Sequence, residues 1–442
     1  MAGITSSVLC HLGRLSSLVT NTYDSEMTVF SMLDLLTCFV IIKSCKKVGL
    51  FADFGSFLSM LRFVFLLFLG GCQLCSPVLA QDGLFETRAD FAFVMDVDNN
   101  TVFLAKNADA RMAPASMSKM MTVALIFEAL KAGRLKLDDK VFMSVNAWRT
   151  GGAPSRTSAM FVPVKSKVTV EQILRGIIVQ SGNDASIAIA EHLSGSEVEF
   201  AKAMTAYGKK IGLKQSSFAN STGLPHEGHM LSARDLALLA QHLIKTYPEY
   251  YPYFAEKEFK YRRYRFLNRN PLIRLDEGYD GLKTGYTKDS KYGIVASLKQ
   301  GKRRLIGVFN GLSKRDDRRT EVRRVMEWAL TSFVAKDIDV ETTKFSARVW
   351  GGDKSWVGLV PRTNMQIYVP RDLPAPEIVG EVIYKGPLKA PIRAGVAVAK
   401  LRIVVENTVQ EVPLFADEPV EEVNFVYRAL DSLFYLTFGW IL

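Results

Sequence analysis

A serine and a lysine lie three positions apart in the segment Ser116-Met-Ser-Lys119. Residues at this spacing share one face of a helix, so the amine of Lys119 can reach the hydroxyl of Ser116. The run 120–127 that follows is almost entirely apolar, as expected of a helix enclosed by other structure. Burial favours the neutral form of a lysine, and a neutral amine can accept the proton of a serine. The spacing therefore predicts a nucleophile, Ser116, beside its base, Lys119.

Two further triplets strengthen this prediction. Taken alone, Ser-x-x-Lys is also compatible with a serine that only caps a helix and a lysine that reaches solvent. The triplet Ser181-Gly182-Asn183 follows an apolar stretch, and Lys283-Thr284-Gly285 precedes a plausible strand at 292–296. Each would be an ordinary turn or strand end by itself. In the order Ser-x-x-Lys, Ser-x-Asn, Lys-Thr-Gly, the three form the signature set of penicillin-binding proteins and serine β-lactamases.

A wider resemblance surrounds these motifs. The segments 111–122, 180–185, 231–236, 268–270 and 280–285 resemble the D-alanyl-D-alanine carboxypeptidases among the low-molecular-weight penicillin-binding proteins. The similarity extends over about residues 85 to 420. It implies a serine-type carboxypeptidase that removes the terminal D-alanine from peptidoglycan stem pentapeptides through an acyl-serine intermediate. Penicillins and other β-lactams would inhibit it covalently, and it would need no cofactor.

The resemblance also implies a role for each motif residue. Ser116, Lys119 and Ser181 would be catalytic, with Ser181 relaying protons to the leaving amine. The backbone N–H groups of Ser116 and Tyr286 would hold the oxyanion; some relatives carry histidine where Tyr286 stands, which bears on substrate preference. The residues expected to bind substrate are Asn183, Lys283, Thr284, Gly285 and Arg318. For the substrate carboxylate, the neighbouring Arg319 is the alternative to Arg318, and a solvated charged turn is the alternative for the whole run.

Three other functions share part of this pattern. A serine β-lactamase is expected to be a single domain with Ser-Asp-Asn and a glutamate base, whereas this chain has Ser181-Gly-Asn183 and a long C-terminal extension. A DD-endopeptidase that cuts crosslinks would use the same residues. A catalytically weak wall-binding scaffold is disfavoured because every motif residue is intact.

Charge distribution and local sequence argue against two kinds of partner, nucleic acid and a metal ion. The net charge of +11 comes from scattered lysines and arginines without interleaved aromatic residues, so we expect no nucleic acid. A basic surface near an anionic wall polymer or membrane is the preferred interpretation. His226 and His229 flank a glutamate, but Pro225 and Gly228 oppose the helix that a His-Glu-x-x-His zinc site needs, so we expect no metal.

An export signal is predicted within the first 80 residues. Met60-Leu-Arg62 precedes the apolar run 63–69, and Pro77-Val-Leu-Ala80 supplies small residues at a cleavage position. We expect residues 60–80 to be a signal peptide, cleaved after Ala80. All five cysteines lie before residue 80, which suits an oxidising compartment. The expected location is the periplasmic face of the bacterial cytoplasmic membrane.

Residues 1–59 have no evident purpose in front of a signal peptide. The preferred explanation is an overlong, non-native extension, with the true start at Met60. A lipoprotein cleavage before Cys72, in Leu69-Gly-Gly-Cys72, is the weaker alternative because it leaves the pattern at Ala80 unexplained.

Residues 81–335 are expected to form the peptidase domain. A hairpin is predicted at 91–97 and 101–106, joined by an Asp/Asn turn. Strands at both ends of this region with helices between them predict an α/β fold in which helices flank both faces of an antiparallel sheet, like the transpeptidase and β-lactamase fold. The other predicted elements are helices at 170–178, 184–192, 198–211, 232–245 and 319–334, and strands at 292–298 and 304–310.

The hydrophobic pattern of the sequence changes after residue 336. Short alternating runs at 365–369, 378–384 and 396–404, separated by Gly, Pro and Asp, predict a small all-β domain over 336–418. We expect it to act as a spacer or docking module rather than in catalysis.

The C-terminal segment 419–442 reads as an amphipathic helix. Its apolar residues recur at helical spacing, whereas Asn424, Arg428, Asp431 and Ser432 gather on the opposite side. Charges in the middle of the segment disfavour a spanning helix, so we expect an anchor that lies in the membrane surface, with Trp440 at the headgroup boundary. An ordinary helix packed on the β domain is the alternative.

Overall fold

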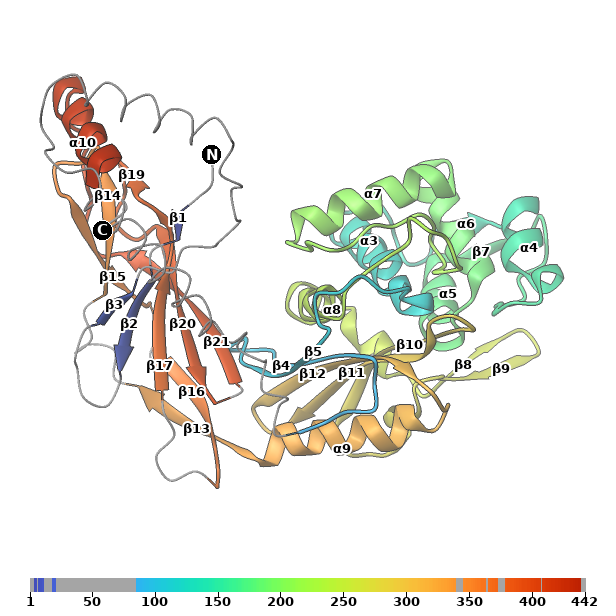
Figure 1. The fold of residues 1–442 in the computed structure, drawn as a ribbon. Coiled ribbons are helices and arrows are strands. Elements are labelled where there is room, and N and C mark those ends of the chain that lie inside the picture. Colours follow the sequence, from blue (N-terminus) through green and yellow to red (C-terminus); the bar gives the residue numbers. More distant parts are fainter. Residues whose placement is uncertain are drawn as a thin grey trace, which may run out of the picture.

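The computed structural model describes residues 4–5, 7–11, 18–20, 85–338, 345–362, 365–372, 378–406 and 408–438. The predicted signal peptide, Cys72 and Trp440 lie outside these residues. Figure 1 shows two lobes joined end to end, with α10 at the far end of the second lobe. The first lobe carries every motif of the sequence analysis.

A five-stranded antiparallel sheet forms the centre of the first lobe, in the order β10-β11-β12-β4-β5. The two N-terminal strands enter this sheet beside the last strand of the lobe, because β4 pairs with β12. The fold predicted from strands at both ends of the region is therefore confirmed. The strands are β4 (Phe91–Asp96), β5 (Val102–Lys106), β10 (Tyr279–Thr287), β11 (Lys291–Gln300) and β12 (Arg303–Leu312).

Alternation along the strands gives each face of the sheet its own core. On β4, Phe93 and Met95 join a large cluster with the helices of one face, whereas Ala92 and Val94 pack on the opposite side against α9. This period of two is what a sheet covered on both faces requires. Figure 1 shows α9 on one side of the sheet and α3 and α8 on the other. The helices are α3 (Lys119–Lys131), α4 (Val145–Gly151), α5 (Val170–Arg175), α6 (Asn183–Ser194), α7 (Glu197–Lys210), α8 (Ala233–Thr246) and α9 (Asp317–Thr331).

Short elements complete this lobe and place the motifs. Ser116 lies on a 3-10 turn, and Ser181 follows a π-helix. The short helices are η2 (Ala115–Ser118), η3 (Ala153–Ser155), η4 (Gly176–Gln180), η5 (Tyr251–Ala255) and η6 (Pro271–Arg274); the small hairpins pair β6 (Lys140–Phe142) with β7 (Lys167–Thr169) and β8 (Glu258–Tyr261) with β9 (Tyr264–Leu267).

Two predicted helices have different bounds in the structure. The one predicted at 170–178 is α-helical only to Arg175 and continues as the π-helix η4. The one predicted at 319–334 begins at Asp317 and ends at Thr331, because Phe333 starts strand β13, which pairs with β16. The apolar residues at this junction fit a helix or a strand equally, so periodicity alone misplaced the end.

The second lobe is a β-domain with its own apolar core. Its strands β20 and β21 form a long hairpin, and a single residue pair, Val409 with Val102, links β21 to β5 of the first lobe. The elements are β13 (Phe333–Ile338), β14 (Phe345–Trp350), β15 (Trp356–Val360), β16 (Met365–Pro370), β17 (Ile378–Ile383), β18 (Lys385–Gly386), β19 (Leu388–Lys389), β20 (Ala397–Val405), β21 (Thr408–Ala416) and α10 (Phe425–Phe438). Near the N-terminus, β1 (Ile4–Thr5), β2 (Ser7–His11) and β3 (Leu18–Thr20) are described as strands, with β2 beside β17.

Candidate active site

The start of the central helix brings the predicted nucleophile and base together. Ser116 lies on η2, half-buried, and Lys119 is the first residue of α3 and fully buried. The Nζ atom of Lys119 lies 2.9 Å from Oγ of Ser116. Serine and lysine are thus within hydrogen-bond distance, as their spacing predicts.

Two carbonyl oxygens complete the surroundings of this amine. Lys119 Nζ donates to Oδ1 of Asn183 at 2.7 Å and also to the backbone oxygen of Thr222. Burial, and secondly the positive charge of Arg269, lower the pKa of Lys119 to about 7. A neutral amine has two N–H groups and one lone pair. With both N–H groups on carbonyls, the lone pair is left to face Ser116, which is the arrangement of a general base.

The first residue of the Ser-x-Asn motif, Ser181, has a strained backbone conformation. Ser181 ends the π-helix η4 with φ at +64°, a conformation rare outside glycine and typical of functional sites. Its hydroxyl is buried and has no hydrogen-bond partner within the described part of the chain. The side chain of Asn183 both accepts from Lys119 and donates to Oγ1 of Thr157 at 2.9 Å. The structure therefore brings Asn183 into direct contact with the base and leaves the Ser181 hydroxyl without a partner among the described residues.

A buried carboxylate fixes the loop in front of this motif. Asp184 accepts the backbone N–H of Met160 at 2.8 Å and of Val162 at 3.2 Å. Burial raises the pKa of Asp184, and these backbone hydrogen bonds oppose the rise. Asn183 adds a backbone bond to the oxygen of Ser158 at 2.7 Å. The loop 158–162 is therefore tied to the Ser-x-Asn segment by three hydrogen bonds.

The Lys-Thr-Gly motif lies on β10, an edge strand of the sheet. At Gly285 an added Cβ would lie 2.9 Å from the backbone oxygen of Pro114, so the strand passes directly against the turn that carries Ser116. Lys283 is fully buried, and burial, followed by the charge of Lys119, holds its pKa well below the usual value. Its Nζ contacts only a backbone oxygen, that of Thr284, at 3.3 Å among the hydrogen bonds of the described residues.

The two candidate arginines differ in their surroundings. Arg318 is 8% exposed, and its guanidinium lies 5.1 Å from the ring centre of Tyr292. Tyr292 in turn stacks on Tyr286, the residue after Lys-Thr-Gly, at 4.4 Å. Burial, then the charge of Arg315, lowers the pKa of Arg318 to about 10. Arg319 is mostly exposed and forms an ion pair with Asp316, so the geometry favours Arg318 over Arg319.

Sequence reasoning missed three contributors to this site. Thr222 acts through its backbone oxygen, Thr157 through a hydroxyl bound to Asn183, and Arg269 through a charge that acts on Lys119 and Lys283. Arg269 stands in a segment already noted in the resemblance, but its side-chain direction is a tertiary feature. A backbone carbonyl leaves no mark on residue type, so only the turn composition around Thr222 could have pointed to it.

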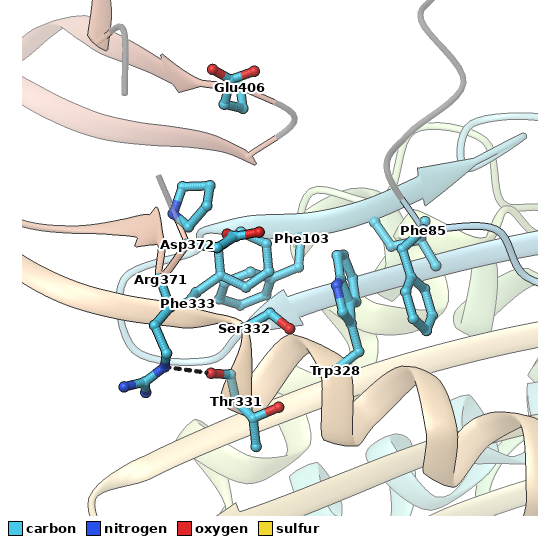
Figure 2. A pocket seen from close by; sticks show the side chains of 11 residues that line it. Phe85, Phe103, Trp328, Thr331, Ser332, Phe333, Arg371, Asp372 and Glu406 are labelled. Atoms are coloured by element: carbon cyan, nitrogen blue, oxygen red, sulfur yellow. Dashed lines mark hydrogen bonds between the residues drawn. The ribbon is translucent and has the colours of Figure 1, made fainter. Parts of the chain in front are cut away.

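Two further features of the described residues are the pair His226 and His229 and a cavity outside the candidate site. His226 and His229 each accept a backbone N–H at Nδ1, and the described residues contain no group of three or more His, Cys, Asp or Glu side chains arranged to hold a metal. A cavity of about 430 Å³ lies at the junction of the two lobes, lined by aromatic residues of β5, α9 and β13 (Figure 2). None of its lining residues belongs to the candidate site.

Comparison with known proteins places this geometry in a family. The family model described as D-alanyl-D-alanine carboxypeptidase matches residues 78–313, and that described as penicillin-binding protein 5, C-terminal domain, matches residues 331–422. The D-alanyl-D-alanine carboxypeptidase DacF of Bacillus subtilis is 35% identical, over 77% of this chain and 87% of its own length. DacC of Escherichia coli is also 35% identical, over 78% and 88%.

Solved structures agree. Penicillin-binding protein 5 from Haemophilus influenzae matches with a TM-score of 0.63 and 30% identity, covering 76% of this chain and 99% of that one. The resemblance inferred from the three motifs is confirmed, and so is the fold that it implied. The chain belongs to the D-alanyl-D-alanine carboxypeptidase family of serine peptidases.

Proposed function

We propose that the protein is a serine-type DD-carboxypeptidase that removes the terminal D-alanine from peptidoglycan stem pentapeptides and is acylated by penicillins. The observation that carries this proposal is the position of Lys119 Nζ, 2.9 Å from Ser116 Oγ and directed by two carbonyl oxygens. The names of the relatives, D-alanyl-D-alanine carboxypeptidases, supply the substrate class.

Acylation follows from the arrangement of Ser116 and Lys119. Ser116 Oγ attacks the carbonyl between the two terminal D-alanines while its proton passes to Lys119. The backbone N–H groups of Ser116 and Tyr286 stabilise the oxyanion. Ser181 relays the proton to the leaving amine, and D-alanine departs. Water then hydrolyses the acyl-serine by the reverse proton path and regenerates Ser116.

Substrate binding uses the edge of the sheet and the cations beside it. The peptide adds to the free side of β10, where Thr284 and Gly285 present the strand, in the manner of β-strand addition. Asn183 orients the scissile amide. Lys283 and Arg318 are buried basic side chains that have no carboxylate partner in the described part of the chain, so both are available to an arriving substrate carboxylate.

Mass spectrometry of a pentapeptide incubated with the purified protein tests the activity. We expect loss of one D-alanine and no further cleavage, with Ser116→Ala inactive. Cleavage of a crosslinked dimer peptide at a comparable rate would point to an endopeptidase instead. A β-lactamase would turn over penicillin rapidly without trimming the peptide.

We propose export to the periplasm through residues 60–80, with the mature protein beginning at Gln81. The pattern of charge, apolar core and small residues supports this proposal. N-terminal sequencing of protein from the native host should give Gln81. A lipidated Cys72, or retained residues 1–59, would contradict it.

We propose that α10, the C-terminal helix, lies in the membrane surface. Its polar side faces the β-domain: Asp431 accepts the backbone N–H of Gly351 at 2.8 Å, and Ser432 accepts from Nε1 of Trp350 at 3.2 Å. In the first turn of α10, Phe425, Val426 and Tyr427 are mostly exposed. Large apolar side chains turned to solvent are a feature of interfacial helices. Among the described residues, the structure has no helix of the length and apolarity that crossing a bilayer requires.

A truncation tests this anchor. Deleting residues 420–442 should release an active enzyme from the membrane fraction. Because Glu421, Glu422 and Asp431 outnumber Arg428, binding should resist high salt and yield to detergent. A truncated protein that stays with the membrane, or an intact one released by salt alone, would contradict the proposal.

A further inference from the structure

The turn that supplies the second carbonyl to Lys119 is organised by one side chain. Three donors converge on Oδ1 of Asn220: the backbone N–H of Thr222 at 3.1 Å, its hydroxyl at 2.9 Å, and the backbone N–H of Gly223 at 2.7 Å. The Asn220 amide also donates to the oxygen of Leu224 at 3.0 Å. Asn220 therefore closes the turn on both sides of Thr222, whose oxygen accepts from Lys119.

Neighbouring elements prevent this turn from shifting. The oxygen of Ser221 accepts from the hydroxyl of Thr122 on α3 at 2.8 Å, and Glu197 of α7 accepts from both the N–H and the hydroxyl of Ser221. Gly223 has φ at +76°, and an added Cβ there would lie 2.0 Å from the oxygen of Ala115. The turn is thus pressed directly against the backbone that carries the nucleophile.

A buried histidine fixes the entry to the turn. Nδ1 of His229 accepts the backbone N–H of Ala219 at 3.1 Å and that of Asn220 at 3.4 Å. Burial lowers the pKa of His229 to about 4, so the ring is neutral at physiological pH and keeps Nδ1 available as an acceptor.

These contacts have a consequence for the base. A neutral amine that donates to Asn183 Oδ1 and to the Thr222 oxygen has one direction left for its lone pair. We infer that Asn220 is a positioning residue for catalysis: it holds the Thr222 carbonyl on Lys119 and so directs the lone pair of that amine at Ser116. The inference rests on the proposed function and adds a residue to it that touches neither substrate nor nucleophile.

Several titratable or charged groups face Lys119, and a pH test must take them into account. They are Arg269 from the segment after β9, Glu197 from α7, Asp184 from α6, Lys283 from β10 and His229 from the loop before α8. None of these groups is itself altered by a substitution at Asn220. A carboxylate introduced at position 220 adds one negative charge to this set, which favours the ammonium form of Lys119.

The experiment measures the acylation rate by fluorescent penicillin from pH 5.5 to 9.5, normalised to the number of sites that label at completion. Asn220→Ala removes the three accepted bonds, and we expect the rate per site to fall about 10- to 100-fold, with KM for the pentapeptide unchanged. Asn220→Asp keeps the acceptor oxygen, so its plateau rate should stay within about threefold while the midpoint of the pH profile rises by about 0.5 to 1 unit. Glu227→Gln, an exposed change in the same loop, is the matched control and should behave as wild type.

The outcomes separate this inference from the proposed function. A wild-type protein that is not acylated would refute the proposed function itself. Normal wild-type acylation with an Asn220→Ala rate per site within twofold of it, or with the loss confined to KM, would overturn only the positioning role. If Asn220→Ala yields no folded protein, Asn220→Asp decides: a plateau rate per site that falls by more than about threefold, although the acceptor oxygen is kept, overturns the inference.

Discussion

Lys119 and Lys283 are both fully buried, yet their surroundings are opposite. Lys119 has three oxygen atoms in hydrogen-bond contact, whereas the described contacts of Lys283 amount to one backbone oxygen at 3.3 Å. Burial lowers the pKa of both. A buried lysine with its acceptors in place is ready to act as a base before any ligand arrives. A buried lysine that lacks them gains a partner when an anion binds.

The local chain explains this difference. Lys119 begins a helix, beside a turn whose carbonyls point inward, and the Ser-x-Asn segment brings an amide oxygen from a third direction. Lys283 lies in a strand whose backbone groups are committed to β11 on one side. The free side of β10 and the cation of Arg318 then define where a peptide with a terminal carboxylate would lie.

Removing the nucleophile should have the largest effect. Ser116→Ala should abolish covalent labelling by fluorescent penicillin, a loss of at least about 10³-fold, because no other group takes over the attack. Ser118→Ala, in the same turn, should still label. Circular dichroism of both variants establishes that the fold is intact, and persistent covalent labelling of Ser116→Ala would place the nucleophile elsewhere.

Exchanging each lysine for arginine should have different effects at the two positions. Lys119→Arg should lose acylation by about 10²- to 10⁴-fold, because a guanidinium stays protonated and cannot accept the serine proton. Lys283→Arg still offers a positive charge to an anionic substrate and should retain more activity. The comparison is made on labelling rates per folded molecule. Equal losses would mean that both lysines act as charges, and the assignment of one base would be wrong.

The carboxylate contact should have an intermediate effect. Arg318→Ala should reduce kcat/KM for D-Ala-D-Ala peptides. The fall should correspond to a loss of about 2 to 4 kcal/mol in transition-state stabilisation, the scale of a lost charge-assisted contact. Penicillin acylation should fall as well, since the drug carries a matching carboxylate. Arg319→Ala, at the exposed neighbour, is the control. If Arg319→Ala shows the larger loss, the role passes to Arg319.

The sequence predicted the parts of the site that depend on residue type and order. The three motifs, the hairpin at the start of the first lobe and the late return of β12 to β4 all followed from spacing and alternation. The contributions of Thr222, Asn220 and Arg269 did not, because they depend on where a turn folds back in three dimensions. The π-helix before Ser181 was also missed, since its residues fit an ordinary apolar helix.

The pH dependence of Ser116 acylation tests the central claim most directly. The base must be neutral to accept a proton, and burial lowers the pKa of Lys119 from its usual range to about 7. The acylation rate should therefore fall about tenfold per pH unit below 7 and reach a plateau above it. Stopped-flow labelling of the wild-type protein gives this profile. A rate that is flat between pH 6 and 8, or that still rises towards pH 10, would contradict a role for Lys119 as the neutral base.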